Sequence, residues 1–261
     1  YLDNEAPYTV VIGAHYDHLG MGHQSGSLLP NSRGQVHYGA DDNASGVAGL
    51  LGLARYYASN RVKESVNFLF VAFSGEELGL LGSKYFVEHS PIDMSKVVLM
   101  LNMDMIGRLA DKPLTIGGWG TSLRFGATIP SLADASGIKY QVDSSGIGPS
   151  DHTSFYLKEK PVLYFFTGVH GDYHKPSDTP DKINAEGEAA IVNLIIELID
   201  ELIKAPESIL FRQAGNPHTA ATQRSFKVTL GVIPDYSFTG KGLKLDDVPK
   251  PVYEPGISSL G

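Results

Sequence analysis

The sequence contains no cysteine. This absence excludes disulfide bonds, thiolate zinc sites and cysteine nucleophiles together. A chain without cysteine fits an exported protein better than a cytosolic one, so we expect a periplasmic or extracellular location. No signal-peptide pattern opens the chain.

The chain also lacks long apolar runs and an excess of positive charge. No apolar run approaches the ~20 residues of a membrane-spanning helix, so no membrane span is expected. A net charge of −8 and a pI near 5.5 argue against nucleic acid as a partner. The length of 261 residues allows one large domain, or one domain with a small appendage.

Strand-like and helix-like segments alternate along the first 205 residues. Short apolar runs rich in β-branched residues predict buried strands at Thr9 to Ala14, Asn67 to Phe73, Val97 to Leu101 and Pro161 to Phe166. Helical patterns cover Ala44 to Ser59, Leu78 to His89, Thr121 to Ala135 and Ala185 to Lys204. The alternation predicts a three-layer α/β/α sandwich with a mainly parallel central sheet, followed by a linker and tail over residues 206–261.

Residue types that bind metals lie at or just beyond the ends of the strand-like runs. They are His15, Asp41, Glu77, Asp104 and His174. Ligands gather at the carboxyl ends of strands in such folds. Two imidazoles and three carboxylates suffice for two neighbouring zinc ions when one carboxylate bridges them. We interpret Asp41 as the bridge, and Asp42 or Asn43 as the cap of the next helix.

A pair of glutamates, Glu76 and Glu77, lies among these candidate ligands. The pair could simply begin a helix, where acidic residues complement the helix dipole. Because adjacent side chains diverge, Glu77 can instead bind metal while Glu76 acts as general base on a water molecule. Asp17 follows His15 by two residues and either forms a turn or accepts the second imidazole N–H, which would fix the tautomer of His15.

Five ordered blocks carry a family resemblance. They read Gly-Ala-His-Tyr-Asp-His, Gly-Ala-Asp-Asp-Asn-Ala-Ser-Gly, Ser-Gly-Glu-Glu-Leu-Gly-Leu-Leu-Gly-Ser, Asn-Met-Asp-Met-Ile-Gly and the segment around His174. From about Tyr8 to Lys204 the chain resembles metallopeptidase family 28 of clan MH, the dinuclear-zinc aminopeptidases. The resemblance implies a phosphorylase/hydrolase-like domain, two zinc ions and peptide substrates.

The resemblance also assigns roles to the matching positions. It implies that His15 and Asp104 hold one zinc and that Glu77 and His174 hold the other. Asp41 would bridge the two ions, with Glu76 as general base.

Further positions match features of the family. A cis peptide often follows the bridging aspartate, which here implies Asp41–Asp42. Tyr173 matches a tyrosine that hydrogen-bonds the reaction intermediate in some members, although it could be an ordinary core residue. The block around Asp151 matches one near the substrate pocket of the family.

We also consider residues that could line a specificity pocket. Met105 follows a candidate ligand, and Phe165 or Phe166 ends a predicted strand. Each of these side chains could equally belong to the core.

Several alternatives remain open from the sequence. A glutaminyl cyclase-like enzyme with one zinc shares the fold, and carboxypeptidase-type or amino-sugar-type members share the ligands. A serine hydrolase is disfavoured because Ser150, Asp151 and His152 are neighbours in sequence and no Gly-x-Ser-x-Gly motif occurs. An inactive binding module is a further alternative, since Phe226 to Leu245 resembles the start of a PDZ domain. The chain begins almost at its first ligand strand, so we expect that elements preceding this strand in the family are missing.

Overall fold

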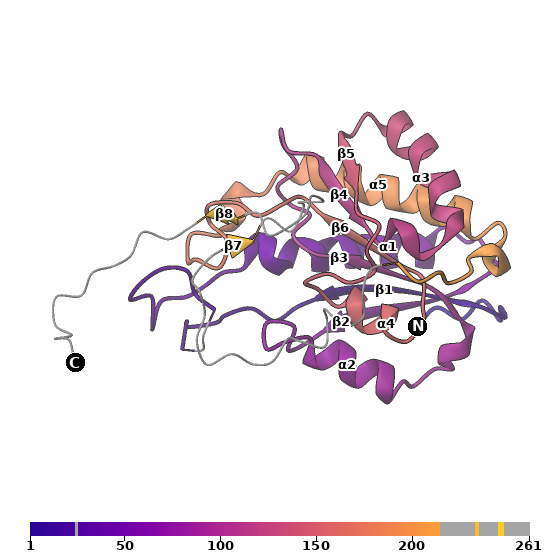
Figure 1. Cartoon of the computed structure of the whole chain (residues 1–261), viewed down its shortest axis with the longest axis horizontal. Helices are drawn as coiled ribbons and strands as arrows, with labels where there is room; N and C mark the ends of the chain where they lie inside the picture. Colours follow the sequence, from indigo (N-terminus) through magenta and orange to yellow (C-terminus); the bar gives the residue numbers. More distant parts are fainter. Residues whose placement is uncertain (24–25, 215–232, 235–244, 248–261) are drawn as a thin grey trace.

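A six-stranded sheet forms the centre of the molecule (Figure 1). The computed structural model describes residues 1–23, 26–214, 233–234 and 245–247. The strand order is β2-β1-β3-β6-β4-β5. The strands are β1 (Thr9–His15), β2 (Asn67–Phe73), β3 (Val97–Met103), β4 (Leu114–Gly117), β5 (Tyr140–Val142) and β6 (Val162–Phe166). The first four strands in this order are parallel, and β4 pairs with β6 in the opposite direction.

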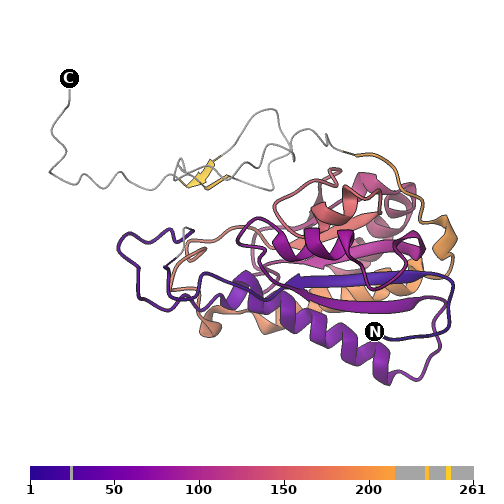
Figure 2. The ribbon, with the colours of Figure 1, turned by 90° about the horizontal axis from the view of Figure 1, so that it is seen from below.

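Helices cover both faces of this sheet, as Figures 1 and 2 show. One face packs against α1 (Gly46–Ser59), α3 (Leu123–Ser136) and α5 (Ala185–Leu202), and the other against α2 (Leu81–Glu88) and α4 (His152–Tyr156). Short 3-10 turns lie at Met94–Lys96, Trp119–Thr121, Pro180–Lys182 and Pro206–Ser208. A two-stranded ribbon pairs β7 (Ile233–Pro234) with β8 (Leu245–Asp247). The predicted three-layer sandwich is confirmed.

Local sequence explains where the helices begin. Asn184 caps α5, because its side-chain oxygen accepts the Gly187 N–H at 3.0 Å. The apolar stripe of α5 is buried on the sheet. Helix α2 begins at Leu81 and not at Leu78, because Leu80 has a left-handed backbone with φ of 62°. Residues 76–80 therefore form a turn before the helix.

The segment from Pro206 to Ala214 packs on the domain, although the sequence predicts a linker there. Ile209 is buried in the core shared by α1, α3 and α5. The Arg212 N–H donates to the Thr121 carbonyl at 2.8 Å, and the Ala214 N–H donates to the Tyr156 hydroxyl at 2.9 Å. Most of the PDZ-like tail predicted beyond this point lies outside the described residues.

The parallel strands place their carboxyl ends at one edge of the sheet. In β1 and β2, His15 aligns with Phe73, and in β3 and β6, Met103 aligns with Phe165. Segments that follow these strands, far apart in sequence, therefore meet at this edge.

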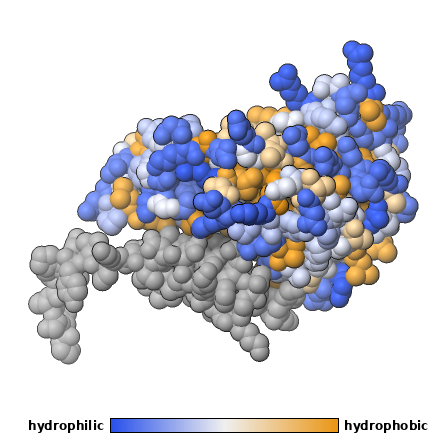
Figure 3. All heavy atoms as spheres, turned by 90° about the horizontal axis from the view of Figure 1, so that it is seen from above, coloured by the Kyte–Doolittle hydropathy of each residue, from blue (hydrophilic) through white to orange (hydrophobic). Residues whose placement is uncertain are grey.

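The surface seen in Figure 3 mixes hydrophobic side chains among hydrophilic ones. In the described part of the chain, every helix is too short or too polar to cross a membrane.

Candidate metal centre

His15 ends β1 inside the protein, with 1% of its surface exposed. Its Nε2 lies 3.3 Å from Asp42 Oδ1 and 3.4 Å from Asp104 Oδ1. Its Nδ1 lies 3.1 Å from the backbone carbonyl of Asp17. A proton on Nδ1 would be held by that carbonyl, which leaves the Nε2 lone pair directed at the two carboxylates.

Asp42, not Asp41, occupies the centre of the cluster. Asp42 Oδ1 faces His15, and Asp42 Oδ2 lies 3.1 Å from His174 Nε2. The Asp41 carboxylate points elsewhere: it accepts the Gly107 N–H at 2.7 Å and lies 3.1 Å from His170 Nε2. The prediction that places Asp41 in the ligand cluster is therefore wrong, and its neighbour Asp42 lies there instead.

The cis peptide of this segment is shifted in the same way, whereas the cap of the next helix is not. The cis peptide joins Asp42 to Asn43, whereas the sequence placed it one residue earlier. Asn43 caps α1 as expected, since its side-chain oxygen accepts the Gly46 N–H at 3.0 Å.

Glu77 approaches the cluster from the turn after β2. Its Oε2 lies 3.2 Å from His174 Nε2, and its Oε1 lies 2.9 Å from His18 Nδ1. Burial opposes ionisation of Glu77, but hydrogen bonds from His174 and His18 outweigh it and lower the pKa of the carboxyl. His18 is a site residue that sequence reasoning missed, although its place three residues after His15 was a usable signal.

The Asp17 carboxylate positions the glutamate pair. It accepts the N–H groups of Glu76 at 3.1 Å and Glu77 at 3.2 Å. The Asp17 carboxylate also lies 3.8 Å from His15 Nδ1, but the backbone carbonyl of Asp17 makes the closer contact. The sequence left open whether Asp17 forms a turn or contacts the His15 imidazole, and in the structure its backbone carbonyl makes that contact.

His174 is held from its other ring nitrogen. Its Nδ1 donates to the Gly26 carbonyl at 2.8 Å. Burial lowers the pKa of His174, but the carboxylates of Asp42 and Glu77 outweigh this effect and raise the pKa to about 10. Burial also lowers the pKa of His15, but the Asp104 carboxylate raises it by more, so the pKa of His15 lies above its usual value. The cluster thus strongly favours positive charge between its carboxylates.

A small cavity of about 40 Å³ opens onto these residues. Its walls include Glu76, Met105, Pro149, Tyr164, Phe166, Val169 and Tyr173. Burial raises the pKa of Glu76, which keeps that carboxyl poised to hold a proton. Met105 and Tyr173, both named from the sequence, line this cavity.

Two other predicted pocket residues lie elsewhere. Phe165 is buried in the core on the α1, α3 and α5 face, because side chains alternate along β6 and only its neighbours Tyr164 and Phe166 reach the cavity. Asp151 is fully buried and does not line this cavity, and burial raises its pKa to about 7.

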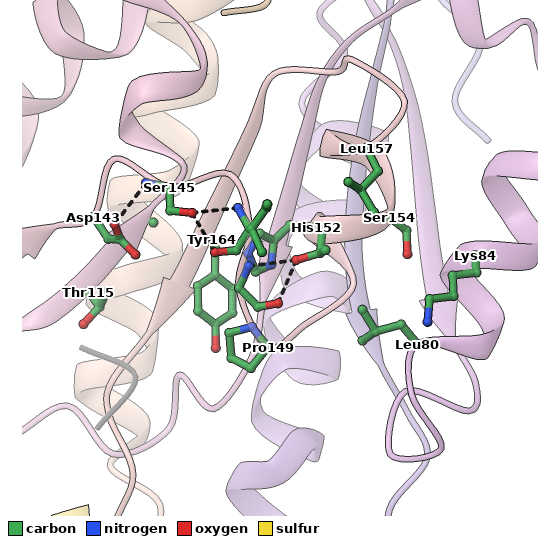
Figure 4. A pocket seen from close by; sticks show the side chains of 14 residues that line it. Leu80, Lys84, Thr115, Asp143, Ser145, Pro149, His152, Ser154, Leu157 and Tyr164 are labelled. Carbon is green, nitrogen blue, oxygen red and sulfur yellow. Dashed lines mark hydrogen bonds between the residues drawn. The ribbon is translucent and has the colours of Figure 1, made fainter. Parts of the chain in front are cut away.

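A second cavity, of about 300 Å³, adjoins the first and shares Pro149 and Tyr164 with it. Figure 4 shows Asp143 and Thr115 on one side of the Tyr164 ring, and Leu80 and Lys84 on the other. The combined space accommodates a group larger than the first cavity alone could hold.

The buried ring of His152 lines this second cavity and stacks on Tyr164, with ring centroids 4.4 Å apart. Burial lowers the pKa of His152 to about 3. As the pH falls below about 6.5, the unfolded state therefore binds a proton that the folded state does not. The free energy of unfolding should fall by about 1.4 kcal/mol per pH unit from this group, or about 2 kcal/mol by pH 5.

His152→Phe should remove this dependence while retaining the ring stacking. Urea unfolding at pH 7.5 and pH 5, with a chelator present throughout, measures the difference between the two proteins. Equal losses of stability in the wild type and the variant would contradict the assignment.

Two groups of donor atoms in the cluster could each hold a metal ion. Ligand atoms of His15, Asp42 and Asp104 lie within 4.8 Å of one another, and those of His18, Asp42 and Glu77 do the same. Neighbouring ligands of a tetrahedral ion with bonds of about 2.0 Å lie roughly 3.3 Å apart. His174 Nε2 lies 3.1 Å and 3.2 Å from its two carboxylate partners, which agrees with that spacing.

The fold and this cluster define a candidate metallohydrolase domain. The sequence model of "Peptidase family M28" matches residues 2–199. The chain belongs to peptidase family M28.

Individual relatives support this grouping. The "Uncharacterized protein YfbL" of Escherichia coli (strain K12) is 28% identical over 221 residues, which cover 73% of this chain and 66% of that protein. "Aminopeptidase YwaD" of Bacillus subtilis (strain 168) is 29% identical over 215 residues, which cover 76% of this chain and 42% of that protein. The chain thus spans less than two thirds of either relative.

Solved structures are similar as well. A structure of BSAP, described as a zinc aminopeptidase from Bacillus subtilis, has a TM-score of 0.61 and 28% identity, covering 79% of this chain and 50% of that one. A glutaminyl cyclase from Porphyromonas gingivalis has a TM-score of 0.65, covering 76% of this chain and 75% of that one. Its identity is 21%, so this second similarity concerns the fold alone.

Proposed function

We propose that this chain is the catalytic domain of a zinc-dependent aminopeptidase, which removes the N-terminal residue of peptides with the help of two zinc ions. The observation that carries the proposal is the position of Asp42. Its two oxygens face His15 on one side and His174 on the other, at 3.3 Å and 3.1 Å. A carboxylate shared in this way suits a pair of neighbouring cations.

His15, Asp42 and Asp104 would hold one zinc, and Asp42, Glu77 and His174 the other. When bound, the ions supply Lewis acidity that lowers the pKa of water and polarises the scissile carbonyl. His18 stays beside Glu77, where it donates to the oxygen that faces away from His174. His15, Glu77 and His174 would then each have a second partner that fixes their orientation.

Glu76 handles the protons of the reaction. It lines the cavity, and its raised pKa suits a group that gains and then loses a proton. Glu76 takes a proton from the attacking water and gives it to the amine that leaves. The hydrogen bond from the backbone N–H of Glu76 to the Asp17 carboxylate holds the Glu76 backbone in place during both proton transfers.

The two cavities orient the peptide. Carboxylates at the first cavity suit a free α-ammonium group, which an aminopeptidase substrate carries and an N-blocked peptide lacks. The apolar side chains of Met105, Phe166 and Val169 contact one side of that cavity and suit an apolar residue. Tyr173 also lines it, and its hydroxyl would donate a hydrogen bond to the oxyanion.

The proposal is tested by counting metal and by comparing substrates. Protein stripped with a chelator and reloaded should bind two zinc ions per chain. Hydrolysis of aminoacyl anilides should disappear on stripping and return on reloading. The N-acetylated form of the same anilide is the matched control and should not be cleaved.

Other results would contradict the proposal. One zinc per chain at saturation would favour the cyclase-like alternative. Cleavage of N-blocked peptides from their carboxyl end would favour the carboxypeptidase-type alternative. An exported location and the PDZ-like tail remain predictions from the sequence.

A further inference from the structure

A buried carboxylate lies directly behind Asp42. Asp178 has no exposed surface, and its Oδ2 accepts two backbone N–H groups, from Asp41 at 2.8 Å and from Asp42 at 3.1 Å. The Ala40 N–H also donates to the Asp178 backbone carbonyl at 3.2 Å. Three consecutive residues of this loop therefore hydrogen-bond to Asp178.

The second oxygen of Asp178 is paired with Arg108. An Arg108 Nη2 donates to Asp178 Oδ1 at 2.9 Å, and the same nitrogen lies 3.6 Å from Asp172. Arg108 has 16% of its side-chain surface exposed, so water screens this pair only in part. Removing one partner of a buried pair such as this is strongly unfavourable, because it leaves the other without compensation.

These contacts join the segments of three candidate ligands. Asp178 lies four residues after His174, and Arg108 lies four residues after Asp104. Asp178 in turn binds the backbone of Asp42, although 136 residues separate the two in sequence. One ion pair therefore ties the end of β3, the loop after β6 and the Asp42 loop together.

We propose that Asp178 and Arg108 are positioning residues that fix the Asp42 carboxylate at the spacing that two cations require. This inference rests on the proposed two-zinc site and adds residues outside its ligand set. A small rotation of the Asp42 backbone would move both carboxylate oxygens, so both cations would be affected together. A pair that only stabilises the fold would leave the cations unaffected.

Four variants separate these two roles. Asp178→Asn keeps an oxygen for the N–H groups but loses the charge that pairs with Arg108. Arg108→Met removes the partner, and Arg108→Lys restores a positive charge. Asp200→Asn is the matched control, because Asp200 accepts the Tyr57 hydroxyl at 2.9 Å on α5 and has no contact with the cluster.

Three measurements are made on each variant. Zinc affinity is measured by competition with a chelator, the visible absorption of the cobalt-loaded protein reports ligand geometry, and kinetics on an aminoacyl anilide separate kcat from KM. We expect Asp178→Asn and Arg108→Met to lower zinc affinity by about 10–100-fold. Both should change the cobalt spectrum and lower kcat more than they raise KM. Arg108→Lys should recover part of the loss, and Asp200→Asn should match the wild type in all three.

The proposal is overturned if zinc affinity and the cobalt spectrum stay as in the wild type while only the melting temperature falls. If Asp178→Asn does not fold, the two Arg108 variants carry the test alone. Zinc affinity and the cobalt spectrum do not depend on turnover. If the wild type binds two cations but cleaves no anilide, these two measurements still show whether Asp178 and Arg108 position the Asp42 carboxylate. A wild type that binds two cations without cleaving anilides would reject the proposed aminopeptidase activity and leave the positioning role standing.

Discussion

Glu76→Gln is expected to reduce kcat by about 10²–10⁴-fold while two zinc ions stay bound. The amide has the shape of the carboxyl but cannot accept a proton from water. Glu76 lines the cavity and is absent from both groups of candidate ligands found among the described residues. Stopped assays on an aminoacyl anilide, together with metal analysis of the same samples, measure both quantities.

The neighbouring glutamate provides the matched comparison. Glu77→Gln should lose zinc, because Glu77 contacts His174 and His18 and belongs to a ligand group. If Glu76→Gln turned over substrate at the wild-type rate, Glu76 could not be the general base. If it lost zinc as Glu77→Gln does, the division of roles between the two residues would be incorrect.

Asp42→Ala is expected to abolish binding of both cations, with a loss of affinity beyond the 10–100-fold typical of residues that only support a ligand. Asp42 is the one residue common to the two ligand groups of the described chain. Asp104→Ala should in contrast lose one cation, since Asp104 belongs to one group only. Zinc per chain, measured after dialysis against a weak chelator, distinguishes the two variants.

Asp41→Asn is the control variant, because it changes the aspartate next to Asp42 in sequence. Asp41 contacts Gly107 and His170 rather than the cluster, and an amide oxygen can still accept the Gly107 N–H. This variant should therefore keep two zinc ions. The opposite pattern, with zinc lost from Asp41→Asn and kept by Asp42→Ala, would restore the original reading of the sequence.

Much of the fold, and the meeting of most candidate ligands at one edge of the sheet, followed from the sequence for a simple reason. Short apolar runs marked β1, β2, β3 and β6, and the carboxyl ends of parallel strands share one edge. Candidate ligands placed at those ends had to meet. The pairing of β4 and β5 was not predicted, because such short strands have too few residues to show a pattern.

The choice between Asp41 and Asp42 could not be made from residue types. Both are aspartates, and both are buried. Only the backbone decides which carboxylate faces the histidines, and Asp42 and Asn43 depart from helical geometry, with φ and ψ of −107° and 88° and of −135° and 44°. Those angles depend on distant partners, such as Asp178, that no local pattern reveals.

A similar limit applied to the cavity. All five residues of β6 are buried, so hydropathy alone did not show which side chains face the site. The sequence left Phe165 and Phe166 as alternatives, and the structure places Phe166 at the cavity and Phe165 in the core.

The reversed direction of β4 has a consequence for how this domain can diversify. The candidate ligands belong to segments that follow parallel strands, whereas much of the wall of the larger cavity comes from β4 and from residues 143–149 after β5. Insertions or exchanges in that wall would reshape the space offered to a substrate without moving any strand that carries a ligand. The size and lining of the larger cavity can thus change while the strands before the candidate ligands keep their places.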